Sequence, residues 1–524
     1  MKANGVEALI VPTDDPHGSE YLADHWQCRR WLTGFTGSAG DAVVTQDEAL
    51  LWTDSRYWLQ AEEQLADTEF CLMRETVDVS IEEWLKQKGL KGYRSFEEPF
   101  DEIWKDRPAL PLTRAWHLED EIAGETAESK LRRLNRWLTD NSRESVLVSD
   151  LSEVCWLLNI RADDIAFTPF IICFLKVYAT GRRVLYVNDC QIEGIREYLK
   201  GLNIGIQEYE NAPREECCDT PVTEWKSIKN PVEQQGFRDA HLHDGVAMVR
   251  FLHRLDDICA SDEPMPTEIG LDKMLTALRR EEEGFIDLSF ETIAGYAAHG
   301  AIVHYEATQE TDIQLERKGF VLLDSGAHYN TGTTDITRTI ALGPLTEEER
   351  RVYTLVLKGH LQLQNLKFPD GTTGLQLDTA ARMAMWREGY DFGHGTGHGV
   401  GHILCVHEGP MQIRKNCRKD TILPMHAGQT MTDEPGVYVT GRFGVRIENT
   451  LLSRMQRQTD FGNFLEFEPL TLCPYDRRAI VTDLLTTEEK RWIDDYHKMV
   501  CERLLPLLKD ESDRLWLQNA TLPL

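Results

Sequence analysis

The stretch FVLLDSGAHYNTGTTDITRTI, residues 320–340, places two aspartates, Asp324 and Asp335, eleven residues apart in strand-forming sequence. The intervening YNTGT contains the Asn and Gly that tight links use, so the stretch predicts a β-hairpin. The aspartates are symmetric about the bond between Tyr329 and Asn330, which predicts that they face each other with Cβ atoms about 5 Å apart. Opposed carboxylates repel and resist burial unless a cation binds both.

A second pair of acids follows in MTDEPGVYVTGRFGVRIENTLL, residues 431–452. Glu434 and Glu448 are fourteen residues apart and symmetric about Gly441, which lies in the turn-like TGRFG. The pattern predicts the same arrangement, two strands with two opposed carboxylates. A single opposed pair of acids is compatible with two surface residues that have no function. Two pairs with the same arrangement favour a common binding site.

A string of glycines and histidines, FGHGTGHGVGHILCVHEGP at residues 392–410, lies between the two acid pairs. Every second residue from 393 to 401 is glycine; His394 and His398 lie between these glycines, and His402 follows the last of them. Each glycine would weaken a helix by roughly 1 kcal/mol. We therefore expect an extended segment with its glycine face packed closely and its other face bearing histidines. The spacing leaves open which of the three histidines would bind a metal ion.

Four carboxylates and one or two imidazoles define the chemistry of the predicted site. This set contains too much oxygen for a structural zinc site, which prefers thiolate and imidazole. It suits two divalent ions sharing bridging carboxylates, with manganese, cobalt or zinc as candidates. Two such ions about 3.5–4 Å apart can hold a bridging hydroxide and polarise a carbonyl. The sequence therefore predicts a dinuclear metal centre.

The bulk composition excludes several other classes of protein. The 524 residues are too many for one core, and the net charge of −30 argues against nucleic acid and anionic membranes as partners. No signal peptide, 18-residue apolar run, Walker motif or HExxH is present. The twelve cysteines, of which only Cys217 and Cys218 are adjacent, predict free and mostly buried thiols in a reducing cytoplasm.

The order of expected elements indicates several domains. Two α/β blocks fill the first 220 residues and resemble each other loosely, WLTGFTG in the first corresponding to WLLNIRADD in the second. Residues 221–233 are a plausible boundary, after which long helices are expected. One of them bears the apolar stripe Leu271, Met274, Leu275 and Leu278, and the C-terminal helix starts at a capping box at Thr486 or Thr487.

Five segments resemble the catalytic signatures of the aminopeptidase P group, in the creatinase/prolidase/methionine-aminopeptidase superfamily. These are HGAIVHY (299–305), LLDSGAHYNTGTTDITRT (322–339), GHGTGHGVGHILCVHEGP (393–410), TDEPGVY (432–438) and GVRIEN (444–449). The amino-terminal DPHGSEYLADHW, the middle WLLNIRADDI and the tail FLEFEPLTLCPYD are similar to the long, three-domain members. The resemblance covers essentially the whole chain. It implies a mixed α/β and α+β protein, with creatinase-like α/β domains at 1–114 and 115–224 and a pita-bread catalytic domain at 225–524.

The resemblance also implies roles for individual residues. The two metals, most simply Mn²⁺ and otherwise Co²⁺ or Zn²⁺, are expected on Asp324, Asp335, His398, Glu434 and Glu448. His304, His394 and His407 are expected to contact substrate and transition state without binding metal, and Arg56 to reach the peptide from the first domain. Tyr438 and Arg446 are expected to orient the ligands. His402 is expected to serve in packing.

The implied activity is hydrolysis of the bond before a proline in the second position of a peptide. A hydroxide bridging the metals would attack the carbonyl, Glu434 would accept the proton, and His304 and His407 would stabilise the oxyanion and the leaving nitrogen. A cytoplasmic homodimer is also implied. The alternatives are a prolidase restricted to Xaa-Pro dipeptides and a pita-bread binding module without activity; the presence of all five ligands argues against the second. The stretch from WLQAEEQL (58–65) to EIWKDRPALPL (102–112) is expected to be shorter than in long relatives.

Overall fold

The computed structural model describes residues 1–214 and 220–524, which divide into two compact units. The first unit contains residues 1–118 and 126–220, and the second contains 119–125 and 221–524. Cys217 and Cys218 lie outside the described residues. The predicted domain boundaries at 114 and 224 stay predictions.

The first α/β block of the first unit is a five-stranded sheet in the order β4-β3-β2-β1-β5. Only its pairs β3–β4 and β1–β5 are parallel. The strands are β1 (Ala8–Pro12), β2 (Asp41–Val44), β3 (Ala49–Thr53), β4 (Phe70–Arg74) and β5 (Gly92–Arg94), and the helices are α1 (Cys28–Thr33), α2 (Trp58–Leu65), α3 (Ile81–Lys88) and α4 (Phe100–Ile103).

The second block repeats this design in a four-stranded sheet, β11-β10-β9-β7. Its strand directions match those of β4-β3-β2-β1, with the pair β10–β11 alone parallel. The strands are β7 (Ser145–Val148), β9 (Phe174–Tyr178), β10 (Arg183–Tyr186) and β11 (Ile204–Gln207); the helices are α6 (Ala127–Asp140), α7 (Leu151–Leu158) and α8 (Arg196–Gly201); and β6 (Trp116–His117) pairs with β8 (Ile160–Arg161). The loose similarity of the two sequence blocks therefore corresponds to a shared strand order.

Long helices open the second unit, as the sequence predicts. Helix α9 (Val222–Ser227) precedes α10 (Pro231–Ala260), which starts at an Asn230 capping box with Pro231 at its first position. Helix α11 (Glu268–Arg280) buries Leu271 and Leu275 of its predicted stripe. Short α5 (Asp120–Ala123) joins this unit, because Asn230 Nδ2 donates to the Ala123 carbonyl at 2.8 Å.

The strands of the second unit form separate small sheets around one six-stranded sheet. The small sheets are β12-β15-β16, β13-β14-β17 and β22-β23, and the large one is β18-β25-β24-β21-β19-β20. The strands are β12 (Phe285–Leu288), β13 (Ile293–Tyr296), β14 (Phe320–Ser325), β15 (Ala327–Tyr329), β16 (Gly332–Thr333), β17 (Ile336–Ala341), β18 (Lys367–Pro369), β19 (Gly397–Gly399), β20 (Glu408–Ile413), β21 (Thr430–Asp433), β22 (Gly436–Val439), β23 (Phe443–Arg446), β24 (Asn449–Thr459) and β25 (Gly462–Pro469).

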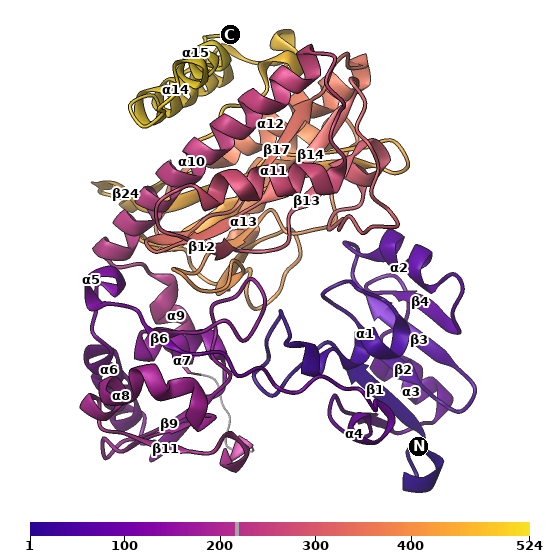
Figure 1. The fold of residues 1–524 in the computed structure, drawn as a ribbon, viewed down its shortest axis with the longest axis vertical. Coiled ribbons are helices and arrows are strands. Elements are labelled where there is room, and N and C mark those ends of the chain that lie inside the picture. The colour runs from indigo at the N-terminus through magenta and orange to yellow at the C-terminus, as the bar shows by residue number, and fades with distance from the viewer. Residues whose placement is uncertain (215–219) are drawn as a thin grey trace. The chain divides into compact units, whose positions relative to one another are not determined.

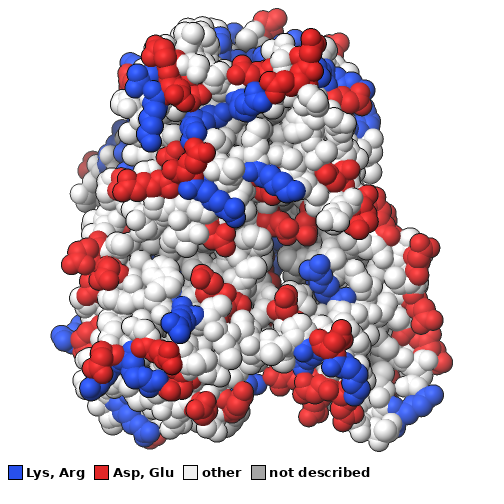
Figure 2. Space-filling view, viewed as in Figure 1, with Lys and Arg blue, Asp and Glu red and all other residues white. Residues whose placement is uncertain are grey.

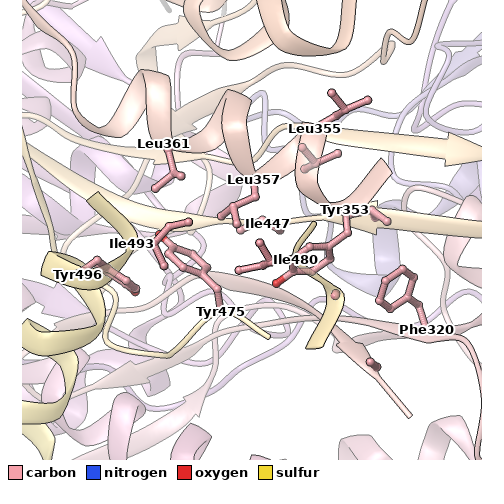
Figure 3. Close-up of a cluster of buried hydrophobic side chains, with 14 of the residues drawn as sticks. Phe320, Tyr353, Leu355, Leu357, Leu361, Ile447, Tyr475, Ile480, Ile493 and Tyr496 are labelled. Atoms are coloured by element: carbon pink, nitrogen blue, oxygen red, sulfur yellow. The ribbon is translucent and has the colours of Figure 1, made fainter. Parts of the chain in front are cut away.

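Helices cover these sheets and enclose an apolar core. Figure 1 shows α10, α11 and α12 (Glu347–Gln364) across one side of β14 and β17, with α13 (Gly374–Trp386) beside them. Helices α14 (Thr487–Leu504) and α15 (Glu511–Ala520) lie at the end of the unit, and Thr486 caps α14. Leu357, Ile447 and Tyr475 are among the side chains that pack between α12, the β22–β23 sheet and α14 (Figure 3).

The charges on the surface, the length of the helices and the exposure of the cysteines can each be compared with the predictions. Acidic and basic side chains are intermixed on the face in Figure 2. In the described part of the chain no helix has the length and apolar character needed to cross a bilayer. All ten described cysteines are free thiols, but only Cys28, Cys155, Cys173 and Cys473 are buried. The expectation of mostly buried thiols is therefore wrong, because Cys71 lies on the edge strand β4 and Cys417 on an exposed loop.

Candidate metal centre

The hairpin of residues 320–341 forms as predicted, but the centre of its turn lies one residue later than predicted. In the β14–β17 ladder Asp324 faces Thr337, not Asp335. The β15–β16 link continues the same register, so the turn is centred between Asn330 and Thr331. Asp335 is therefore the diagonal neighbour of Asp324, two residues from its cross-strand partner. The prediction of directly opposed aspartates is wrong because hairpin register depends on which two residues occupy the turn.

The second hairpin has the predicted register. Strands β21 and β24, and then β22 and β23, pair in one continuous antiparallel register in which Glu434 and Glu448 are opposite positions. Both glutamates lie in the break between these two ladders. The Glu434 N–H donates to the Thr396 carbonyl at 2.8 Å, and the Glu448 N–H donates to the Thr337 carbonyl at 3.1 Å. These bonds attach the second hairpin to the histidine string and to the first hairpin.

The histidine string is extended, as predicted. Strand β19 runs between β20 and β21 in the large sheet. A Cβ atom on Gly397 would lie 2.0 Å from the Thr432 carbonyl oxygen, and one on Gly399 would lie 2.5 Å from the Glu408 carbonyl oxygen. At Gly395 the nearest heavy atom would be 3.6 Å away. Gly397 and Gly399 therefore allow the neighbouring strands to approach β19 closely.

Three of the predicted metal ligands converge within ligand distance. One donor atom from each of Asp335, His398 and Glu448 lies within 4.8 Å of the others. His398 Nε2 is 3.5 Å from Asp335 Oδ2. His398 Nδ1 donates to the Gly399 carbonyl at 2.8 Å, so Nε2 is the nitrogen that faces Asp335 and can bind a metal once it has lost its proton.

Asp324 and Glu434 border this trio. Arg446 donates to Asp324 Oδ2 from Nη2 at 2.6 Å and from Nε at 3.2 Å. Asp324 Oδ1 is buried and has no hydrogen-bond partner among the described residues. Glu434 Oε2 lies 4.0 Å from His394 Nδ1. A buried carboxylate oxygen without a donor is a position that a cation can satisfy.

The pKa values of the cluster show the cost of burying these groups together. Burial raises the pKa of Glu434 to about 7, and burial plus the charges of Asp335 and Asp324 raises that of Glu448 well above its ordinary range. Burial also raises the pKa of Asp324, although Arg446 opposes the shift. Burial lowers the pKa of His398, but Asp335 outweighs it and the net pKa is about 9. Divalent cations would replace these retained protons, so the donor set fits a metal centre.

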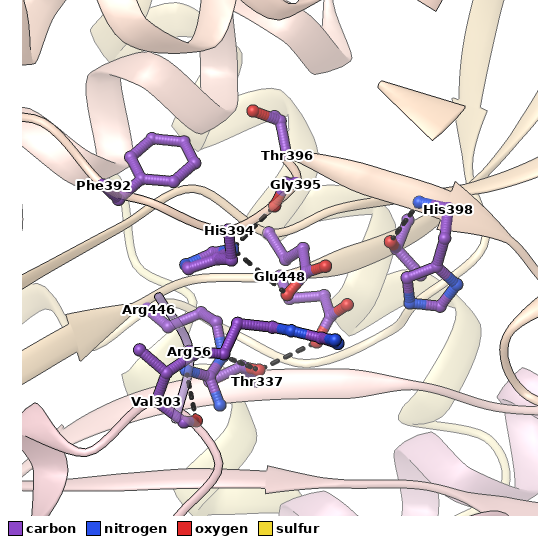
Figure 4. A network of polar contacts seen from close by, with 12 residues as sticks. Arg56, Val303, Thr337, Phe392, His394, Gly395, Thr396, His398, Arg446 and Glu448 are labelled. Atoms are coloured by element: carbon purple, nitrogen blue, oxygen red, sulfur yellow. Dashed lines mark hydrogen bonds and ion pairs between the residues drawn. The ribbon is translucent and has the colours of Figure 1, made fainter. Parts of the chain in front are cut away.

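Arg446, Tyr438 and His394 form a hydrogen-bonded chain beside Asp324. Arg446 Nη1 donates to the Tyr438 hydroxyl at 2.8 Å, and this hydroxyl lies 2.8 Å from His394 Nε2. His394 Nδ1 donates to the Gly395 carbonyl at 2.6 Å, so Nε2 accepts from Tyr438. The chain fixes the orientation of all three side chains at the edge of the site, and Figure 4 shows its two ends, Arg446 and His394.

The remaining predicted site residues are His407, His304 and Arg56. The His407 ring centre is 4.3 Å from that of His398. His304 follows Val303, whose carbonyl accepts from Arg446 Nη1 at 3.3 Å. Arg56 lies in the first unit, where its Nη2 is 2.7 Å from Asp54 Oδ2.

Residues that the sequence analysis did not predict complete the site. Thr337 Oγ1 donates to Glu448 Oε2 at 2.8 Å and accepts from Arg446 Nε at 3.2 Å. Arg338, on the opposite face of β17, donates to the Glu448 carbonyl at 2.6 Å. The alternating Thr-Arg-Thr of DITRT was the available signal for these residues. His402 is buried with Nε2 2.8 Å from the Thr331 carbonyl, in agreement with its expected packing role.

Comparison with protein families covers nearly the whole chain. The model "Metallopeptidase family M24" matches residues 235–454, and "C-terminal region of peptidase_M24" matches 463–524. Two models of the creatinase/prolidase N-terminal domain match residues 1–98 and 106–220.

Full-length relatives share about a third of the residues. Xaa-Pro aminopeptidase 1 of Dictyostelium discoideum is 35% identical over 599 residues, covering 100% of this chain and 95% of that protein. Aminopeptidase P1 of Arabidopsis thaliana is 32% identical, covering 99% and 96%. The crystal structure of X-prolyl aminopeptidase from Caenorhabditis elegans, described as a cytosolic enzyme with a di-nuclear active site, superposes with a TM-score of 0.93 at 33% identity, covering 99% of this chain and 95% of that one.

Proposed function

This chain belongs to metallopeptidase family M24, in the form with creatinase/prolidase N-terminal domains, and on that premise we propose that it is an Xaa-Pro aminopeptidase. It hydrolyses the bond between the first residue of a peptide and a proline in second position. The observation that carries the proposal is the convergence of Asp335, His398 and Glu448 beside Asp324 and Glu434, in a chain aligned over its full length with aminopeptidases of this specificity.

The five residues Asp324, Asp335, His398, Glu434 and Glu448 would hold two divalent cations. When bound, the cations polarise the scissile carbonyl and lower the pKa of water. We propose Mn²⁺ as the physiological ion, because a carboxylate-rich set with one imidazole suits it. His398 would bind through Nε2, the nitrogen that its bond to Gly399 leaves free.

Glu434 is proposed as the proton acceptor. Its Oε2 lies 4.0 Å from His394 Nδ1 at the edge of the cluster, where a carboxylate can accept a proton from a water molecule within hydrogen-bond reach. His407, beside His398, and His304, on the segment that Arg446 holds through Val303, are proposed to stabilise the oxyanion and the leaving proline nitrogen. Arg56 is proposed to contact the peptide beyond the cleaved bond, and His394 to contact the substrate near Glu434.

Cleavage of matched peptides with controlled metal content tests the proposal. Protein stripped with EDTA and reloaded with Mn²⁺, Co²⁺ or Zn²⁺ is offered Arg-Pro-Pro, Arg-Ala-Ala and the dipeptide Ala-Pro. We expect metal-dependent release of arginine from Arg-Pro-Pro and none from Arg-Ala-Ala. Cleavage of Ala-Pro without cleavage of Arg-Pro-Pro would instead identify a prolidase. A folded protein that cleaves neither with any metal would contradict an enzymatic role.

We further propose that the enzyme is a cytoplasmic homodimer. The description of the Caenorhabditis elegans enzyme as cytosolic supports the location. Met383 and Trp386, one turn apart on α13, are 41% and 44% exposed, and such apolar groups favour a protein interface. Light scattering of the native chain should give twice the chain mass, and Trp386→Ser should lower it toward the monomer. A wild-type monomer at micromolar concentration would refute the dimer.

A further inference from the structure

Helix α13 buries a charged pair. Asp378 and Arg382, one turn apart, are 1% and 0% exposed, and Arg382 Nε donates to Asp378 Oδ2 at 2.7 Å. The other buried side chains of this helix, Leu377, Ala381 and Met385, are apolar. Replacing a buried ion pair by apolar residues of similar volume is often neutral or stabilising, so packing alone does not account for the pair.

The remaining hydrogen bonds of the pair reach three alternate residues of the histidine string. Arg382 donates to the Phe392 carbonyl from Nη1 at 2.7 Å and to the His394 carbonyl from Nη2 at 3.1 Å. Asp378 Oδ1 accepts from the Thr396 hydroxyl at 2.6 Å. The guanidinium also lies over the Phe392 ring, 3.6 Å from its centre. Helix α13 is thus attached to the first five residues of the string.

This attachment lies where the described chain has no regular structure, because residues 387–396, between α13 and β19, form neither helix nor strand. Buried carbonyls in such a segment need side-chain partners, and Arg382 supplies two N–H groups. At its end the segment joins the site: the Thr396 N–H donates to the Ile413 carbonyl at 2.7 Å, and the Thr396 carbonyl accepts from the Glu434 N–H.

The side chain of His394 depends on the position of this segment. Its Nε2 accepts from the Tyr438 hydroxyl at 2.8 Å, and its Nδ1 lies 4.0 Å from Glu434 Oε2. Movement of the main chain at His394 would change both distances. His398 has further support, because it lies in β19 and its N–H donates to Thr432 Oγ1 at 3.1 Å.

We propose that Asp378 and Arg382 are positioning residues for the peptidase reaction. They act through residues 392–396 to hold His394 and Glu434 where the substrate requires them, and neither is among the residues proposed to contact metal or substrate. The proposal rests on the proposed aminopeptidase function. A displacement of about 1 Å in such groups can lower activity about 100-fold.

A matched pair of substitutions at Thr396 tests the proposal. Thr396→Val keeps the shape of the side chain but leaves Asp378 Oδ1 without its donor, whereas Thr396→Ser keeps the hydroxyl. We expect kcat/KM for Arg-Pro-Pro to fall about tenfold or more in Thr396→Val and to stay within about threefold of native in Thr396→Ser. Mn²⁺ affinity, measured by isothermal titration, should stay within about threefold in both, because His398 keeps its own support.

Arg382→Lys tests the same arrangement from the helix. Lysine keeps the charge, but an ammonium group cannot reproduce the planar fork that binds Asp378 and two carbonyls together. We expect kcat/KM to fall about tenfold or more here too, again with Mn²⁺ affinity nearly unchanged. Arg351→Met, which removes an exposed pair with Glu388 just beyond α13, is the control and should match the native chain.

Hydrogen exchange of the Mn²⁺-loaded full-length proteins, followed by mass spectrometry, measures the positioning independently of activity. Peptides that contain the Thr396 and Glu434 amides should exchange about tenfold or more faster in Thr396→Val than in Thr396→Ser. Equal exchange in the two variants, unchanged kcat/KM, or a parallel loss of Mn²⁺ affinity would each overturn the proposal. A native chain that cleaves no peptide would contradict the proposed function instead, and the exchange rates would still decide whether α13 holds the string.

Discussion

Arg446 connects most of the side chains around the metal centre. It pairs with Asp324, donates to Tyr438 and to the Val303 carbonyl, and contacts Thr337. It is 1% exposed, so its charge acts in a medium of low dielectric constant. One buried cation thus orients Asp324, which is proposed to bind metal, and the segment that carries His304, which is proposed to contact substrate.

Replacement of Arg446 by methionine should weaken the metal centre. Asp324 would lose its partner and its pKa would rise further, so we expect metal affinity and kcat/KM to fall about 10–100-fold. Isothermal titration with Mn²⁺ and peptide cleavage measure both. Arg442→Met, which removes an exposed pair with Glu348, is the matched control and should change neither. Equal metal affinity in the Arg446 variant and native protein would contradict the role.

At the scale of elements, two hairpins and one extended strand assemble the site. In each hairpin the acids lie at or beside a break in the ladder, where the chain leaves one sheet for another. Main-chain groups released at such a break pair with a third segment, as the Glu434 N–H does with Thr396. At these breaks the acidic side chains can therefore point toward one centre. The main-chain hydrogen bonds made there join the three segments.

Two glycines of the histidine string provide a matched test of strand approach. In Gly397→Ala the new Cβ would collide with the Thr432 carbonyl, so β19 must move and take His398 with it. We expect a loss of about 1–3 kcal/mol in unfolding free energy and weaker metal binding. Gly395→Ala, where the added atom has room, should stay within about 0.5 kcal/mol of native. Urea unfolding measures the stability of both variants. Equal free energies of unfolding would contradict the role of Gly397 in the close approach of the strands.

Helix α11 fixes the segment that carries His304 through one buried carboxylate. Glu268 accepts from the Tyr296 N–H at 2.7 Å, from His299 Nδ1 at 2.9 Å and from the Tyr305 hydroxyl at 2.9 Å. Its side chain is fully buried, so these three donors satisfy its charge.

Glu268→Gln should therefore impair the handling of substrate but not of metal. The amide keeps the size of the side chain but replaces one acceptor oxygen by a donor, which faces Tyr305 or His299. We expect kcat/KM to fall about tenfold with Mn²⁺ affinity unchanged. Glu310→Gln, exposed on the same segment, is the control. A parallel loss of metal affinity would show a general structural defect instead.

At the scale of the whole molecule, the free energy of unfolding depends on histidines that are buried in the neutral form. His497 Nε2 accepts from the Tyr475 N–H at 3.0 Å, and its Nδ1 has no partner among the described residues. Burial, with help from the positive charges of Arg477 and Arg338, lowers the pKa of His497 to about 3. The unfolded chain instead binds a proton near pH 6.5.

The native chain should therefore lose stability in acid through His497. A depressed folded-state pKa contributes stability above pH 6.5, and this contribution is lost as the pH falls toward 3. By pH 4.5 the loss from this group is about 3 kcal/mol. Urea unfolding in EDTA at pH 7 and 4.5 should show a smaller decline for His497→Gln, which can still accept from Tyr475 but does not titrate. Equal declines in the two proteins would refute the assignment.

The local features of the site could be predicted from its sequence because they depend on neighbouring residues. Strand-forming residues on either side of turn residues identified both hairpins, and glycine content identified the extended string. The register around Gly441 was predicted correctly, whereas that around Asn330 was not. Gly441 lies at φ 71°, a conformation that marks its turn, but YNTGT offers more than one possible turn centre.

The sequence by itself determined which side chains could bind metal and that they lie on hairpins and an extended strand, because these follow from residue chemistry and local backbone preference. Only the tertiary structure decided that Asp335, His398 and Glu448 meet, that Asp324 lies diagonal to Asp335, and that Arg446 joins Asp324 to Tyr438. These contacts depend on how the sheets break and pack and on which residues form each turn, and no local pattern encodes that geometry.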